Sequence, residues 1–209
     1  MTYAVQPILI WPLSLAAIPG YRAACDRTFE AVQCWYREKA GRAFTLRSTF
    51  EIRVPWDQFY FADMYLFCQR SPTAPSNPCD PERIFYFVIP EPPPGAAVGG
   101  GTYDPNVWGC PPGLPGRSCI SGGMAHLLLG GDIAAMGYPL VDWAREQRQA
   151  IGAVAHEIGH CVGLPHPEDM TDPTIMFGWW DFPAVGFQQA EREIVRASPF
   201  FSRRRGRHW

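Results

Sequence analysis

Residues 156–166 read His-Glu-Ile-Gly-His-Cys-Val-Gly-Leu-Pro-His, and they are the most informative part of the chain. His156 and His160 are four residues apart in a segment that predicts a helix, so their side chains lie one turn apart on the same face. Gly163 allows a sharp reversal because glycine adopts a positive φ without steric cost. The reversal brings His166 back, and we therefore predict that His156, His160 and His166 bind one metal ion.

The residue types favour a catalytic zinc over a structural one. Three imidazoles leave the fourth position of a tetrahedral zinc for water, whereas a structural site is closed by protein ligands. Zinc lowers the pKa of such a water to about 7, which provides a nucleophile at neutral pH. Glu157 directly follows the first histidine, and we predict that it accepts the proton of the water and then passes it to the leaving amine. Three of the five histidines fall in this stretch, which argues against surface histidines on an amphipathic helix.

The stretch has the pattern HExxHxxGxxH at every fixed position, and it resembles the zinc motif of the metzincin peptidases. Metzincins also carry a methionine in a tight turn beneath the zinc. Residues 174–178, Thr-Ile-Met-Phe-Gly, resemble this Met-turn and place Met176 at its centre. Met170 is a competitor, but it lies only four residues after His166, which leaves little chain for the turn.

The resemblance implies an α+β fold, with a twisted mixed β-sheet, a backing helix, the zinc-binding helix, and a small C-terminal subdomain that ends in a helix. It implies a zinc-dependent endopeptidase with one catalytic zinc and a protein or peptide substrate. The site residues would be the base Glu157, the turn residue Met176, and the ligands His156, His160 and His166. We expect a single catalytic domain over residues 1–209, with an upper part at about 1–163 and a lower part at about 164–209.

The sequence does not select one metzincin subfamily. His166-Pro167 resembles the serralysins, and other parts resemble matrixins or astacins. Serralysins and astacins have a tyrosine near the metal, two residues after the turn methionine, whereas Gly178 occupies that position here. In metzincins the segment after the Met-turn walls the pocket for the residue that follows the scissile bond. Here that segment is aromatic, which implies an apolar pocket or, alternatively, core packing by Trp179, Trp180 and Phe182.

Two other functions stay open on the sequence. One is a catalytically silent, zinc-containing module that binds a peptide or a glycan, although such a site has no need of Glu157. The other is a zinc hydrolase of a non-peptide amide or ester. The position of His166 after Gly163, together with the downstream Met176, favours a peptidase over this second alternative.

The rest of the chain predicts sheet and helix elements in a compatible order. Helical spacing predicts helices at residues 21–40, 142–162 and 188–197. Apolar or alternating segments predict strands at residues 8–13, 44–54, 83–90 and 124–129. The strand at 83–90 is apolar on both faces, so we expect it in the centre of the sheet. Residues 91–123 are rich in Pro and Gly and predict a long loop, and residues 165–183 are expected to be irregular.

Composition limits the class of protein. With 47% hydrophobic and 18% charged residues, the 209-residue chain can bury a sizeable core. The net charge of −2 gives no reason to expect a nucleic-acid partner. No apolar run approaches the ~20 residues of a membrane-spanning helix. Calcium is possible in acidic loops, but no binding pattern is present at Asp104, Asp132, Glu168, Asp169 or Asp172. The oligomeric state cannot be read from the sequence.

Seven cysteines favour an oxidising compartment. Cys68 and Cys79 bracket one Pro-rich loop, and Cys110 and Cys119 bracket another, so each pair is a candidate disulfide. Scattered buried thiols in a cytosolic protein are the alternative, because connectivity does not follow from the sequence. We expect a secreted, extracellular or periplasmic protein.

Overall fold

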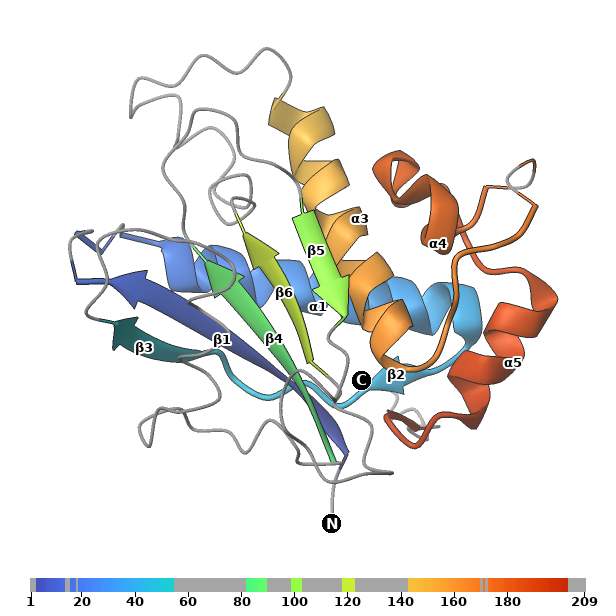
Figure 1. The fold of residues 1–209 in the computed structure, drawn as a ribbon, viewed down its shortest axis with the longest axis horizontal. Coiled ribbons are helices and arrows are strands. Elements are labelled where there is room, and N and C mark those ends of the chain that lie inside the picture. Colours follow the sequence, from blue (N-terminus) through green and yellow to red (C-terminus); the bar gives the residue numbers. More distant parts are fainter. Residues whose placement is uncertain are drawn as a thin grey trace, which may run out of the picture.

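The structure, a computed structural model, describes residues 3–13, 16–17, 19–54, 82–89, 99–102, 118–122, 143–169, 171 and 173–202. A five-stranded mixed sheet carries two long helices, and a smaller part beside them contains short helices and a final helix (Figure 1). The predicted α+β fold is confirmed, because the mixed sheet, the backing helix, the helix with His156 and His160, and the C-terminal helix are all present. The division of residues 1–209 into an upper and a lower part stays a prediction.

The strands of the main sheet lie in the order β3-β1-β4-β6-β5. All neighbours are parallel except β5, which runs antiparallel to β6 at the edge. The central strand is β4, as predicted, and Ile84, Phe85 and Tyr86 are buried on its alternate faces. The strands are β1 (Ala4–Pro12), β3 (Phe50–Val54), β4 (Arg83–Ile89), β5 (Gly99–Thr102) and β6 (Ser118–Gly122).

The single strand predicted at residues 44–54 is wrong, because the segment forms two strands. Its first part is β2 (Ala43–Phe44), which pairs with β7 (Phe201–Ser202), and its second part is β3, which pairs with β1. Between the two strands, the Thr49 hydroxyl and backbone N–H both donate to the Asp26 carboxylate on the backing helix. The chain before Thr49 still pairs with β1 at one point, because Leu46 forms an isolated parallel bridge with Val5. The Val5 N–H donates to the Thr45 carbonyl at 2.8 Å, and the Arg47 N–H donates to the Val5 carbonyl at 3.0 Å. The alternation of residues 44–54 contains no sign that this pairing is interrupted before β3.

The long loop predicted at residues 91–123 is wrong where it contains β5 and β6. Both strands are rich in Gly and Ser and lack an alternating apolar pattern. Their extended form depends on pairing, of β6 with β4 and of β5 with β6, so tertiary context overrides a weak local preference. The strand predicted at residues 124–129 lies outside the described residues.

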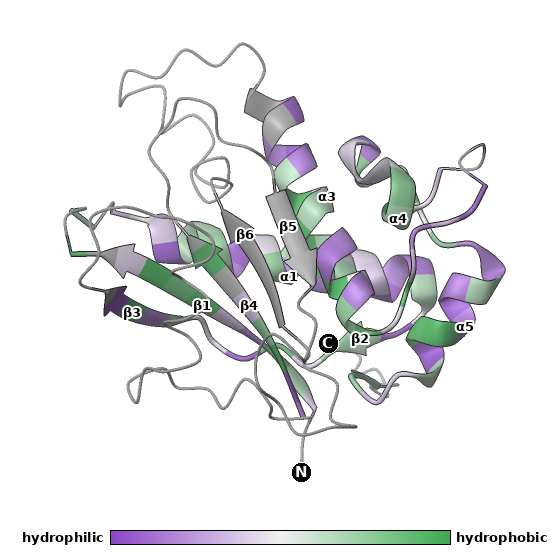
Figure 2. Cartoon of the chain, viewed as in Figure 1, coloured by the Kyte–Doolittle hydropathy of each residue, from purple (hydrophilic) through white to green (hydrophobic). Residues whose placement is uncertain are grey.

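The predicted helices are present as α1 (Tyr21–Ala40), α3 (Trp143–Cys161) and α5 (Gln189–Ala197). Helix α1 ends at Gly41, whose φ of 72° lets its N–H donate to the Arg37 carbonyl. Figure 2 shows largely apolar residues along β1 and β4 and mixed polar and apolar residues around α5. None of the described helices combines the length and apolar character that a membrane-spanning helix needs.

Tyr36 on α1 is the centre of the contact between the sheet layer and the C-terminal part. Its hydroxyl donates to the Ala155 carbonyl on α3 at 2.8 Å. Its ring lies 5.8 Å from the ring of Phe44, 5.3 Å from that of Phe187 and 4.9 Å from that of Phe201, measured between centroids. Aromatic pairs at such separations add to the free energy of burial. Helix α1 is therefore the backing helix that joins α3 to the chain after the metal motif.

Gly152 allows α3 to approach the short 3-10 helix η2 (Trp179–Asp181). A Cβ at this position would overlap the Trp179 carbonyl oxygen and lie 2.8 Å from the Cβ of Phe182. Alanine normally stabilises a helix interior by about 1 kcal/mol relative to glycine, but overpacking a core costs about 1–3 kcal/mol. The atom that a Cβ would strike is a backbone oxygen, so we take the overpacking cost at the upper end of this range. After the gain in helix propensity is subtracted, we expect Gly152→Ala to lower the free energy of unfolding in urea by about 1–2 kcal/mol.

The control for this substitution is Arg148→Ala, on the exposed surface of the same helix. Its free energy of unfolding should stay within about 0.5 kcal/mol of the wild-type value. A Gly152→Ala protein as stable as the wild type would contradict the close contact between α3 and Trp179.

Candidate metal centre

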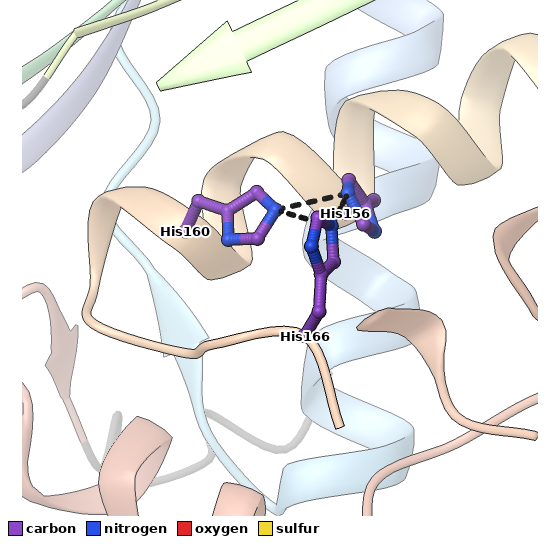
Figure 3. Close-up of side chains that lie close together, drawn as sticks. All are labelled: His156, His160 and His166. Carbon is purple, nitrogen blue, oxygen red and sulfur yellow. Dashed lines mark hydrogen bonds between the residues drawn. The ribbon is translucent and has the colours of Figure 1, made fainter. Parts of the chain in front are cut away.

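Helix α3 and the loop after it bring the three predicted histidines together. Nε2 of His160 lies 3.0 Å from Nε2 of His156 and 3.1 Å from Nε2 of His166, and the remaining pair of Nε2 atoms is 3.4 Å apart. Figure 3 shows the three rings pointing toward one another, two from the helix and one from the loop. Within the described part of the chain, this is the only group of three or more His, Cys, Asp or Glu side chains able to hold one metal ion.

Gly163 makes the reversal that brings His166 to the other two histidines. Its φ is 99°, in the region that favours glycine, and a Cβ there would meet no other atom within 4 Å. Backbone conformation, and not lack of space, therefore calls for glycine. Gly163 N–H donates to the His160 carbonyl at 2.9 Å, and Leu164 N–H donates to the Gly159 carbonyl at 3.0 Å. These bonds satisfy carbonyls at the end of α3 and fix the direction in which the loop leaves.

Backbone carbonyls set the tautomer of the two helical histidines. His156 Nδ1 donates to the Ile175 carbonyl at 2.9 Å, and His160 Nδ1 donates to the Leu164 carbonyl at 2.8 Å. A carbonyl oxygen only accepts, so each Nδ1 carries the proton and each neutral ring has its lone pair on Nε2. Two lone pairs that face each other at 3.0 Å repel unless a cation lies between them. Such second-nitrogen contacts are the usual partners of metal-ligating histidines.

The spacing of the three Nε2 atoms fits zinc. Zinc–nitrogen bonds of about 2.0–2.1 Å at tetrahedral angles separate the ligand atoms by about 3.3–3.4 Å. The separations of 3.0, 3.1 and 3.4 Å lie within a few tenths of an ångström of that value. A set of three histidines also leaves one position of the ion open for a water molecule or a substrate.

Burial favours the neutral form of the two helical imidazoles, His156 and His160. Burial lowers the pKa of His156 to about 4. The hydrogen bond to the Ile175 carbonyl raises this pKa, but the nearby His160 and His166 lower it further. Burial also lowers the pKa of His160. Neutral imidazole is the form that binds a metal ion, so both helical histidines are ready to bind at neutral pH without first losing a proton.

Glu157 is buried beside the cluster, with 5% of its surface exposed. Its Oε1 lies 3.9 Å from Nε2 of His156, and its Oε2 has no hydrogen-bond partner among the described residues. Burial raises the pKa of the Glu157 carboxyl to about 7. A buried carboxyl oxygen without a partner is uncommon in folded proteins. A carboxyl with this pKa can both accept and return a proton near neutral pH.

Met176 lies in the short helix α4 (Ile175–Gly178), inside the segment expected to be irregular. Its side chain is buried and packs on α3, where a Cβ on Gly159 would come within 2.6 Å of its Sδ. Gly159 lies between His156 and His160 in the sequence, so Met176 supports the turn of α3 that carries both of them. The sequence placed Met176 near the metal motif but contained no sign that the neighbouring Ile175 carbonyl holds His156.

The aromatic residues after Met176 divide into two environments. Phe182 is buried, with its ring 5.6 Å from that of Trp35, whereas Trp180 is 41% exposed. Trp180 and Phe182 line a cavity of about 610 Å³. Its described lining includes neither Glu157 nor the three histidines, but it includes charged side chains that the sequence did not indicate, namely Arg145, Arg148 and Asp181.

The disulfide predictions are not tested by the structure. Cys68, Cys79 and Cys110 lie outside the described residues, and so does the side chain of Cys119. The secreted location therefore stays a prediction.

Of the candidate calcium ligands, Glu168 and Asp169 are exposed, and Asp104, Asp132 and Asp172 lie outside the described residues.

No protein-family model and no curated protein matches the sequence. The fold is similar to that of wild-type OgpA from Akkermansia muciniphila, with a TM-score of 0.58 and 16% identity over 96% of this chain. This chain spans 62% of the length of that chain. Fold and site together therefore define an α+β protein with a three-histidine cluster arranged to hold a metal ion.

Two further solved structures show a weaker likeness. Archaemetzincin (amzA) from Methanopyrus kandleri has a TM-score of 0.45 and 19% identity, covering 97% of this chain and 91% of its own. A zinc-dependent peptidase from Methanocorpusculum labreanum (strain Z) has a TM-score of 0.41 and 17% identity, covering 90% of this chain and 92% of its own. At these TM-scores the two likenesses do not establish a shared fold.

Zinc should stabilise the folded protein if the cluster binds it. A ligand that binds only the folded state adds about 2.7 kcal/mol at a hundredfold excess over its Kd. We expect zinc to raise the Tm of the metal-stripped protein in calorimetry, and we expect His160→Ala to lose most of that rise because one of three ligands is gone. His208→Ala, a histidine far from the zinc motif in the sequence, is the control and should retain the rise. An equal rise in His160→Ala and the wild type would contradict the site.

Proposed function

We propose that this protein is a zinc-dependent endopeptidase. The observation that carries the proposal is the convergence of three Nε2 atoms within 3.0–3.4 Å of one another, with the buried carboxyl of Glu157 beside them. Three imidazoles are a ligand set that leaves zinc a free position. A carboxyl next to that position is what water-mediated hydrolysis needs as a base.

Each residue of the site has a separate task in this proposal. His156, His160 and His166 hold the ion, which when bound acts as a Lewis acid and lowers the pKa of a water molecule to about 7. Glu157 accepts a proton from the attacking water through its unpartnered Oε2 and returns it to the amine that leaves. Burial raises the pKa of its carboxyl to about 7, and an ion held by the histidines would favour the ionised form that accepts the proton.

The surroundings of Glu157 favour an enzyme over a silent binding module. A buried polar group without a partner costs about 1–3 kcal/mol of stability, and a module that only binds would gain nothing in return. The resemblance of the zinc motif to the metzincins, with Met176 packed against Gly159, favours a peptide bond over a non-peptide amide or ester. Metzincin membership, a secreted or periplasmic location, and a protein or peptide substrate are parts of this proposal.

The proposal predicts that Glu157→Gln loses peptidase activity but keeps zinc. The amide has the size of the carboxyl but cannot accept the proton, so kcat should fall by about 10²–10⁴-fold. Cleavage of a quenched-fluorescent peptide library measures activity, and atomic absorption measures bound zinc. Glu193→Gln, an exposed carboxyl on α5, is the matched control and should cleave like the wild type.

Each outcome of this experiment decides something. Equal cleavage by Glu157→Gln and the wild type would contradict the role of Glu157. If the folded, zinc-loaded wild type cleaves no peptide but hydrolyses an ester or a non-peptide amide, the protein is a zinc hydrolase of such substrates and not a peptidase. A zinc-loaded wild type that hydrolyses neither kind of substrate would favour the binding module.

A further inference from the structure

Glu191 is a buried carboxyl in the first turn of α5, with 7% of its surface exposed. Its Oε2 accepts the Gln188 backbone N–H at 2.8 Å, and its Oε1 accepts the Thr174 hydroxyl at 3.0 Å. The first contact caps α5, but the second leaves that helix and reaches the start of α4. Glu193 on the same helix is exposed and accepts a hydrogen bond from the Gln189 side chain at 3.2 Å, so of the two carboxyls on α5 only Glu191 is buried.

The contact with Glu191 determines how the Thr174 hydroxyl is used. A hydroxyl has one hydrogen, and a carboxylate only accepts, so the hydrogen of Thr174 points to Glu191. The lone pairs of Thr174 Oγ1 are then free to accept the Met176 N–H, at 3.1 Å. Thr174 is 2% exposed, so solvent has almost no access to take over either role.

The Met176 N–H and the Ile175 carbonyl belong to the same peptide group. Because a peptide group is planar, fixing the direction of its N–H also fixes the direction of its C=O. That carbonyl accepts the Nδ1–H of His156 at 2.9 Å. A continuous chain of hydrogen bonds therefore runs from Glu191 through Thr174 and one peptide group to His156.

We propose that Glu191 is a positioning residue of the metal centre, which orients His156 through Thr174 and the Ile175–Met176 peptide. The inference rests on the proposed zinc site. Other bonds keep α4 in place without Glu191, because Ile175 N–H donates to the Gly186 carbonyl at 2.9 Å and Gly178 N–H donates to the Thr174 carbonyl at 2.6 Å. Loss of Glu191 should therefore rotate the peptide group and His156 more than it unfolds the segment.

Three substitutions separate this role from simple packing. Glu191→Gln keeps the size of the side chain and one acceptor for the cap of α5, but it presents an NH₂ donor to Thr174. Thr174→Val keeps the shape of the side chain and removes the hydroxyl. Thr174→Ser keeps the hydroxyl and removes only the methyl group. Glu193→Gln is again the matched control, with the same chemical change on an exposed part of α5.

The readouts are zinc affinity by chelator competition, the visible absorption bands of the cobalt-loaded protein, and the Tm of the metal-free protein. We expect Glu191→Gln and Thr174→Val to bind zinc about 10–100-fold more weakly, which is the usual effect of losing an outer partner of a ligand. Their cobalt bands should shift because the geometry at His156 changes. Thr174→Ser and Glu193→Gln should bind zinc like the wild type and keep its cobalt spectrum.

Wild-type zinc affinity and cobalt bands in folded Glu191→Gln and Thr174→Val would overturn the inference. An equal loss in Thr174→Ser and Thr174→Val would also overturn it, because the methyl group and not the hydroxyl would then matter. If Thr174→Val does not fold, Glu191→Gln decides by the same criteria. A wild type that binds no zinc would overturn the proposed function itself, whereas a zinc-binding wild type with unaffected variants would overturn only the positioning role.

Discussion

The 2.9 Å hydrogen bond from His156 Nδ1 to the Ile175 carbonyl is the contact on which the rest of the site depends. It joins the helix of the metal motif to the short helix that follows the motif in sequence. It also fixes the tautomer of His156, so that the Nε2 lone pair faces His160 and His166. The reversal at Gly163, the packing of Met176 and the cap of α4 by Thr174 all serve to bring that carbonyl to that nitrogen.

The chain after the metal motif approaches α3 closely at two glycines, where α3 has no side chain. Gly152 and Gly159 lie on either side of His156, and each is in close contact with the chain after the motif, through Trp179 and Met176 respectively. Any larger residue at Gly152 would push back a carbonyl, which is backbone and cannot move aside cheaply. This face of α3 therefore combines a metal ligand with the close packing that holds the ligand still.

Burial has opposite effects on the two kinds of group at the site. It lowers the pKa of His156 to about 4 and raises that of Glu157 to about 7, because an apolar environment disfavours either charged form. The same buried environment therefore keeps His156 in the neutral form that binds a metal ion and gives Glu157 a carboxyl that exchanges protons near neutral pH. A positive ion held by the histidines would in turn favour the ionised form of Glu157, which is the form that accepts a proton.

The sequence by itself determined the features that depend on near neighbours in the chain. These are the extents of α1 and α5, the shared face of His156 and His160, and the reversal at Gly163, because helical period and glycine conformation are local properties. Tertiary structure decided the rest. The two ends of the predicted strand at residues 44–54 pair with different strands, β7 and β1. Pairing also makes strands of Gly-rich segments, and Glu191 reaches Thr174 from another helix. Each of these contacts joins residues that are distant in sequence, so a local sequence pattern cannot predict it.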